Sequence, residues 1–182
     1  MTGALKTAPR KAVSRQTERE TAGERSQGRA LVLERFVPYR IVALGHAFSR
    51  RLSSAYADEN VTITEWRVLA VISQAERIAA RDVVRRTPMD KMAVSRAAAS
   101  LEEKGLVLRA ADPDDRRVIT LSLTPAGRDV FNRIAALALD YEDALLAALE
   151  PEEAAAFRAV LEKLEIRAGE VFGAHGEDND AC

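Results

Sequence analysis

A single change of sequence pattern limits what this chain can fold into. As far as Leu106, apolar residues recur mainly at helical spacing, and they do so again from Thr124 onward. Between these parts lie two short segments rich in branched residues, 106–109 and 118–123, which are predicted to be strands. The polar loop that joins them contains Pro113 and is too long for a two-residue turn. The chain is therefore predicted to be mainly α with one small β-hairpin.

Helix-start signals define two helices in the first part of the chain. A helix is predicted over about 33–57, and its regular part is expected to start at Pro38, because proline is tolerated in the first turn of a helix. The string Thr62-Ile-Thr-Glu65 is a capping-box pattern, in which a hydroxyl and a carboxylate each satisfy a free backbone amide. We expect it to open the second helix.

Two further helices are predicted before the hairpin. A short third helix covers Ala79–Arg86, and the following Thr87-Pro88-Met89 is a turn because proline ends the helix before it. Asp90 is then the expected N-cap of a fourth helix that runs to Lys104, where Gly105 stops it in a left-handed cap.

After the hairpin, two long helices are expected. Thr124-Pro125 is an N-cap followed by proline at the first helical position, and Glu150-Pro151 opens the last helix in a similar way. Both helices carry apolar residues near helical spacing. The short helices and the hairpin that precede them are too small to cover these apolar faces alone. We expect these faces to be covered in a dimer.

The order helix, short helix, turn, helix, hairpin is typical of a winged helix-turn-helix, whose second helix enters the major groove of DNA. The candidate recognition helix is Asp90–Lys104, with Lys91, Ser95 and Arg96 away from its apolar side. Arginine can form two parallel hydrogen bonds with a guanine edge, and lysine can bind phosphate. The alternative interpretation is a solvated amphipathic helix.

The hairpin loop favours the DNA-binding interpretation. It places Arg116 and Arg117 beside three aspartates, including Asp115. An aspartate that holds an arginine by a bidentate bond would make it project rigidly, which suits a narrow minor groove. The alternative is a cluster of surface ion pairs that contributes little to stability.

These strings resemble the MarR family of transcriptional regulators. The wing and helix start, 112–127, and the recognition helix with its exit, 92–107, carry the resemblance, which covers about 33–172. It implies a triangular homodimer held by the first, fifth and sixth helices, bound to a palindromic DNA operator. It also implies that Ser95 and Arg96 face the major groove and that Asp115, Arg116 and Arg117 serve the wing.

The chain is therefore divided into five expected segments. These are a disordered basic arm (1–29), an N-terminal dimerisation helix (30–60), a winged helix-turn-helix domain (61–123), C-terminal dimerisation helices (124–172) and a disordered acidic tail (173–182). Seven basic residues face three acidic ones in the arm, which favours loose contact with phosphates. The family pattern lacks such an arm.

The resemblance also implies a small, often aromatic effector that releases DNA. Tyr39, His46 and Arg50 form roughly one stripe on the first helix, and Trp66 and Arg67 begin the second helix. Together they could bind an aromatic acid or its CoA thioester, and 33–40 and 65–67 loosely resemble regulators that answer to hydroxycinnamoyl-CoA. The alternative is that these residues only pack, since stripes at helical spacing are usually packing.

Other function classes find little support. Among the 182 residues there are two histidines and one cysteine, Cys182, so no zinc spacing occurs, and no phosphate-loop or nucleophile motif is present. No apolar run approaches the roughly 18 residues that span a bilayer. We expect a cytoplasmic repressor-type regulator without metal, cofactor or catalytic activity. The open alternatives are a protein-interaction module with the same fold and a regulator without an effector.

Overall fold

The computed structural model describes residues 30–173, so the predictions about the basic arm and the acidic tail lie outside the described residues. The chain divides into two units, Met1–Ala47 and Phe48–Cys182, and each is described by itself. The segment boundaries expected near residues 60 and 123 stay a prediction.

The first unit is helical where it is described. It contains a 3-10 helix, η1 (Leu33–Arg35), and the first part of α2 (Val37–Ala55). The α-helix thus begins with Pro38 in its first turn, as expected, because proline costs no hydrogen bond there, and the 3-10 helix occupies the first residues of the predicted range. Large apolar side chains of this unit are exposed, among them Phe36, Ile41 and Leu44.

The second unit continues α2 and then turns through a 3-10 helix, η2 (Ala57–Glu59), into α3 (Ile63–Ile72). The predicted capping box is confirmed. The Glu65 amide donates to Thr62 Oγ1 at 3.2 Å, and the Thr62 amide donates to Glu65 Oε2 at 2.7 Å. These bonds fix where α3 begins.

The helix-turn-helix consists of α4 (Ala80–Arg86) and α5 (Lys91–Glu103). Asp90 is the N-cap of α5, since its Oδ1 accepts from the Ala93 amide at 2.7 Å. Gly105 adopts the left-handed conformation, with φ of 69°, and so ends the helix as predicted.

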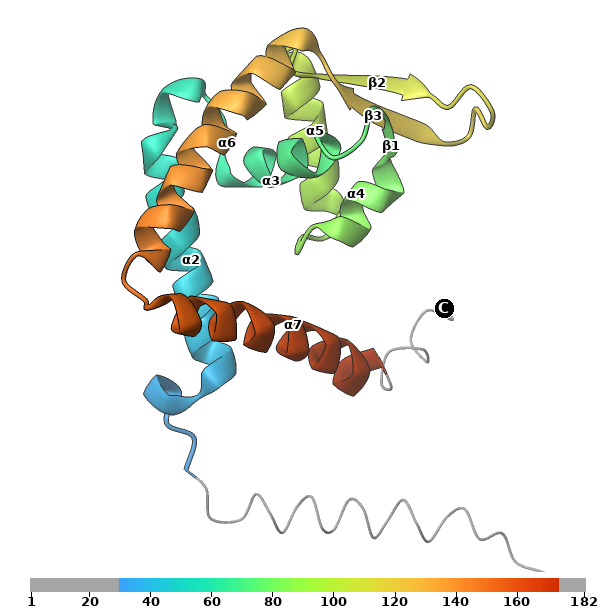
Figure 1. The fold of residues 1–182 in the computed structure, drawn as a ribbon. Coiled ribbons are helices and arrows are strands. Elements are labelled where there is room, and N and C mark those ends of the chain that lie inside the picture. The colour runs from blue at the N-terminus through green and yellow to red at the C-terminus, as the bar shows by residue number, and fades with distance from the viewer. Residues whose placement is uncertain (1–29, 174–182) are drawn as a thin grey trace, which may run out of the picture. The chain divides into compact units, whose positions relative to one another are not determined.

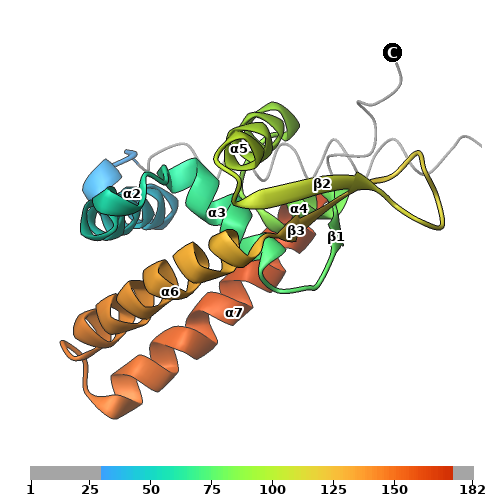
Figure 2. The same ribbon diagram turned by 90° about the horizontal axis from the view of Figure 1, so that it is seen from above.

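The sheet has three antiparallel strands in the order β1–β3–β2, where the sequence predicted a two-stranded hairpin. The strands are β1 (Ile78–Ala79), β2 (Val107–Ala111) and β3 (Ile119–Leu123). The missed strand has two residues, too few to show alternation, and it pairs with β3 only through the tertiary fold. The β2–β3 hairpin extends beyond the helices (Figure 2).

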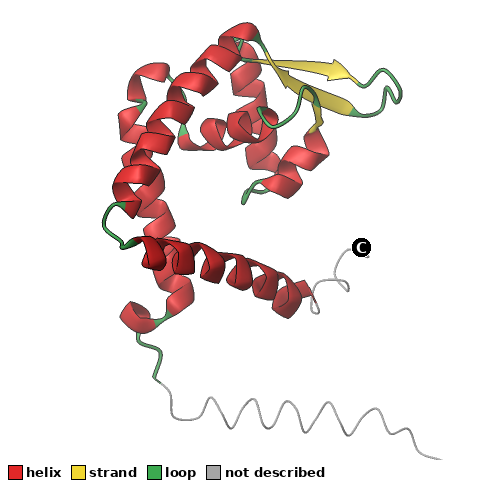
Figure 3. Cartoon of the chain, viewed as in Figure 1, coloured by secondary structure: helices red, strands yellow, loops and turns green. Residues whose placement is uncertain are grey.

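Two long helices complete the second unit, α6 (Pro125–Leu146) and α7 (Pro151–Gly173), which a short loop joins (Figures 1 and 3). Thr124 caps α6, since its Oγ1 accepts from the Gly127 amide at 2.9 Å. The core lies between α3, α5, the sheet and the first half of α6, where Ile134 is fully buried. Farther along α6, the apolar side chain of Leu137 is exposed.

Candidate nucleic-acid interface and ligand cavity

Helix α5 has one buried and one exposed face. The buried stripe packs towards α3 and consists of small or branched residues: Val94, Ala97, Ala98 and Leu101. The predicted DNA-binding residues Lys91, Ser95 and Arg96 are all exposed. In the described part of the chain, no carboxylate forms an ion pair with Arg96.

A hollow of about 310 Å³ lies beside α5, between α4 and the sheet. Lys91 and Ser95 line it together with two cations from neighbouring elements, Arg81 and Arg109. Ser95 therefore faces this hollow, whereas Arg96 is not part of its lining.

The loop of the wing is shaped by aspartates in a way that differs from the prediction. Asp112 Oδ1 accepts from the amides of Asp114 and Asp115 at 2.9 and 3.3 Å, and Asp115 Oδ1 accepts from the Arg117 amide at 3.0 Å. The expected bidentate bond to an arginine side chain is wrong for this structure, because the aspartates satisfy local backbone amides instead. Over residues 30–173, neither Arg116 nor Arg117 forms an ion pair.

The base of the hairpin is linked to α5 by an ion pair that the sequence did not indicate. Arg109 Nε on β2 lies 3.6 Å from Glu102 Oε2 on α5. Both side chains are partly exposed, so the pair contributes little to stability. Its geometry nevertheless connects the wing with the last turn of the recognition helix.

A buried polar cluster joins the start of α3 to the end of α5. Lys104 Nζ donates to both carboxylate oxygens of Glu65 at 2.8 Å and to the Asn60 carbonyl at 2.7 Å. Burial alone would raise the pKa of Glu65, but hydrogen bonds from Lys104, Ser100 and the Thr62 amide outweigh it and lower that pKa. Glu65 therefore stays ionised and holds α5 against α3.

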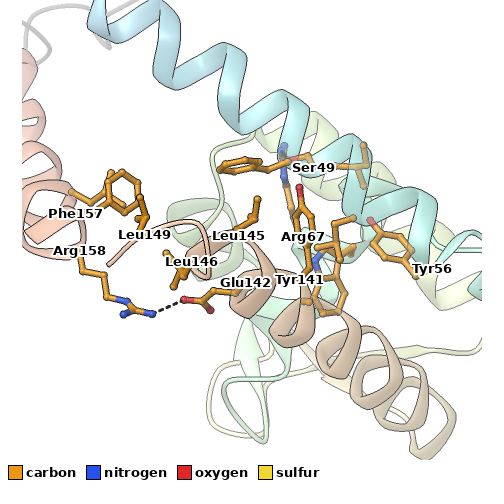
Figure 4. Close-up of a pocket in the computed structure, with 16 residues that line it drawn as sticks. Ser49, Tyr56, Arg67, Tyr141, Glu142, Leu145, Leu146, Leu149, Phe157 and Arg158 are labelled. Carbon is orange, nitrogen blue, oxygen red and sulfur yellow. Dashed lines mark hydrogen bonds and ion pairs between the residues drawn. The ribbon is translucent and has the colours of Figure 1, made fainter. Parts of the chain in front are cut away.

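A cavity of about 520 Å³ lies within the second unit, between the end of α2, α3, α6 and the start of α7 (Figure 4). Its walls are mainly apolar. Aromatic side chains are prominent among them: Phe48, Tyr56, Trp66, Tyr141 and Phe157. A space of this size and lining fits a small organic molecule.

Few polar groups face this cavity. Arg67 Nη2 donates to Ser49 Oγ at 3.1 Å, and no carboxylate in the described residues pairs with this guanidinium. Burial raises the pKa of the Tyr56 phenol, partly offset by Arg67, so the hydroxyl stays protonated. Glu142 and Arg158 form an ion pair at 3.2 Å between α6 and α7 (Figure 4).

The structure brings together only part of the predicted ligand set. Trp66 and Arg67 line the cavity, but Arg50 is exposed on α2 and is not part of its lining. Tyr39 and His46 belong to the first unit, where both are exposed.

The sequence missed Ser49, Tyr56 and Tyr141 as cavity residues. Tyr56 and Tyr141 lie at helical spacing from other apolar residues, and periodicity alone does not separate a core position from a cavity wall. Ser49 is recognisable only through its bond to Arg67, 18 residues away in sequence.

Among the described residues, no group of histidine, cysteine and carboxylate side chains is arranged to bind a metal ion. No described helix combines the length and the hydropathy that crossing a bilayer requires.

Helices α4 and α5 with the adjoining β2–β3 hairpin define a winged helix-turn-helix. A model of the MarR family matches residues 59–118. The regulator TtmR of Methylorubrum extorquens is 30% identical over 121 residues, which are 66% of this chain and 58% of TtmR. The repressor Rv2887 of Mycobacterium tuberculosis is 25% identical, over 69% of this chain and 91% of its own. The winged helix-turn-helix of this chain is therefore similar to that of the MarR family of transcriptional regulators.

A solved structure gives the same result. The MarR/EmrR family regulator from Acinetobacter is 26% identical and has a TM-score of 0.70, over 77% of this chain and 99% of that chain. These relatives are regulators and not enzymes, which agrees with the prediction from the sequence.

Proposed function

We propose that this protein is a transcriptional regulator that binds an operator in double-stranded DNA, with α5 in the major groove. The exposed face of α5, with Lys91 and Arg96 available for base and phosphate contacts, is the observation that carries the proposal. Arg116 and Arg117 at the tip of the exposed hairpin suit the adjacent minor groove. A MarR variant from Escherichia coli in complex with operator DNA shares this fold, at 24% identity and a TM-score of 0.66.

The proposed binding form is a homodimer on a palindromic site. Exposed apolar residues on one side of α7 support it, with Phe157 at 43%, Val160 at 49% and Leu164 at 43% exposure. An apolar helix face of this kind is stable in water when a second copy covers it. Two copies related by a two-fold axis would read half-sites about one helical turn apart.

The direct test is selection from a random duplex pool, followed by binding of the selected DNA across a salt series and sedimentation of the same sample. We expect a near-palindromic site, an affinity that falls steeply with salt because counterions are released, and the mass of two chains. Binding that depends on neither the DNA sequence nor the salt concentration would contradict sequence-specific recognition of DNA. A folded monomer that binds the site would contradict the dimer.

Arg96→Ala is expected to weaken operator binding by about 1–3 kcal/mol and to relax preference at one base position, because it removes an edge contact. Arg167→Ala is the matched control, since this exposed arginine lies on α7 and pairs with Glu170. Fluorescence anisotropy on the selected site and its single-base variants measures both effects. Equal binding by Arg96→Ala and wild type would remove Arg96 from the interface.

We infer that the cavity binds a small aromatic acid, or the acyl part of its CoA thioester, and that binding relieves repression. Arg67 and Ser49 offer an anion site, and Trp66 and Tyr56 offer ring contacts. BpsR of Bordetella bronchiseptica, which has a similar fold at 22% identity, is a protein whose DNA binding is regulated by 6-hydroxynicotinic acid.

Arg67→Gln is expected to weaken the binding of benzoate and hydroxycinnamate at least about tenfold, because a charge-assisted hydrogen bond to the carboxylate is lost. Calorimetry with free acids and acyl-CoA esters measures the affinity, and anisotropy measures the release of operator DNA. Arg50→Gln, outside the cavity, is the control and is expected to bind like wild type. If none of these compounds binds wild type, the effector proposal fails while the DNA-binding proposal stands.

A further inference from the structure

One side chain occupies the centre of the exposed face of α5 and is apolar. The buried stripe of this helix contains Val94, Ala97 and Leu101. With about 3.6 residues per turn, the direction opposite this stripe passes through Met92 and, two turns later, near Ala99. Met92 is 63% exposed, the largest exposed fraction given for an apolar side chain of α5. It therefore projects away from the body of the unit.

The surroundings of Met92 separate it from the other exposed residues of α5. Ser95 lies towards the hollow beside α4, and Arg96 lies on the other side of the central line. Ala99 carries only a methyl group, so the helix can approach a surface closely there. Met92 also lies in the first turn of α5, the part of a recognition helix that reaches base edges.

The major groove presents one prominent apolar group, the C5-methyl of thymine, among hydrogen-bond donors and acceptors. Methionine is unbranched and polarizable, so it can adapt to such a group and remove it from water. We infer that Met92 reads a thymine methyl in each half-site of the operator. This inference rests on the proposed DNA-binding function and adds a specificity-determining residue to it.

The test uses the full chain and the duplex selected by wild type. Each thymine is replaced in turn by uracil, which removes the methyl and leaves every hydrogen-bonding group in place. We expect one substitution in each half-site to weaken wild-type binding about three- to tenfold, the effect of exposing one methyl group and its contacts. Met92→Ala should bind the thymine site about as weakly, and the same uracil substitution should then cost it nothing.

Leu108→Ala is the matched control, because Leu108 is also an exposed apolar residue, at 57%, but lies on β2. This variant should keep the full sensitivity to uracil. Because Met92 is exposed, its replacement should leave the unfolding transition unchanged, which thermal denaturation checks. A selected site without thymine, or a uracil penalty that Met92→Ala retains, would overturn the inference. If wild type selects no sequence, the proposed function itself fails.

Discussion

Gly127→Ala is expected to destabilise the protein by about 3 kcal/mol or more, a large fraction of the free energy of unfolding of a typical domain. Gly127 is buried in the first turn of α6, and a Cβ built there would lie 1.9 Å from the Leu106 carbonyl oxygen. That carbonyl accepts from the Thr124 amide at 3.1 Å, so it is held in place. Backbone atoms on both sides cannot move apart as a flexible side chain would.

Gly169→Ala is the matched control for this substitution. Gly169 is also inside a long helix, α7, but nothing lies within 4 Å of its added Cβ. Alanine should therefore stabilise the helix there by up to about 1 kcal/mol, the ordinary gain in propensity. Chemical denaturation of the two variants should give shifts of opposite sign. A small or favourable effect at Gly127 would show that the start of α6 can move away from Leu106.

Removing one partner of the Glu65–Lys104 pair is expected to cost about 2–4 kcal/mol. Glu65 is 4% exposed, so Lys104→Met leaves a buried carboxylate without its cation. Glu65→Leu removes the carboxylate that pairs with the Lys104 ammonium, and it also removes half of the capping box. The double variant, in which both charges are absent, should lose less free energy of unfolding than the two single variants lose together. An additive cycle would show that the pair has no net coupling.

The same pair gives an expected pH dependence. Because the folded protein holds the pKa of Glu65 below its ordinary value of 4.5, the carboxylate stabilises the fold above that pH, and this stability is lost as pH falls through the lowered pKa. Glu59, whose pKa is lowered mainly by a hydrogen bond from Arg133, titrates in the same range in every variant. The difference between wild type and the double variant therefore isolates Glu65. Unfolding curves from pH 6 to about pH 3 measure it.

The order of the elements was predictable from the sequence because it depends on local signals. The Thr62 capping box, the Asp90 and Thr124 caps and the left-handed Gly105 are formed by residues within one or two turns of each other. Each signal satisfies backbone groups that every helix end exposes. The exposed positions on α5 were also predictable, because they lie opposite the apolar stripe of the same helix.

Contacts between distant segments were not predictable in this way. Strand β1 is too short to have a pattern and exists because β3 offers a free edge. The cavity brings Ser49 to Arg67, and the buried cluster brings Glu65 to Lys104 across 39 residues. The wing aspartates had two sets of donors available, arginine side chains and backbone amides, and the loop conformation selected the amides.

The sequence by itself determined the helices, the hairpin and the exposed face of α5, because periodicity and capping act over a few residues. Only the tertiary structure decided which polar groups face the cavity and why Gly127 must lack a side chain. Those properties depend on how closely segments far apart in the chain approach one another, and no local pattern records that distance. Arg67 illustrates both, since its place on α3 is local and its position in an aromatic cavity is not.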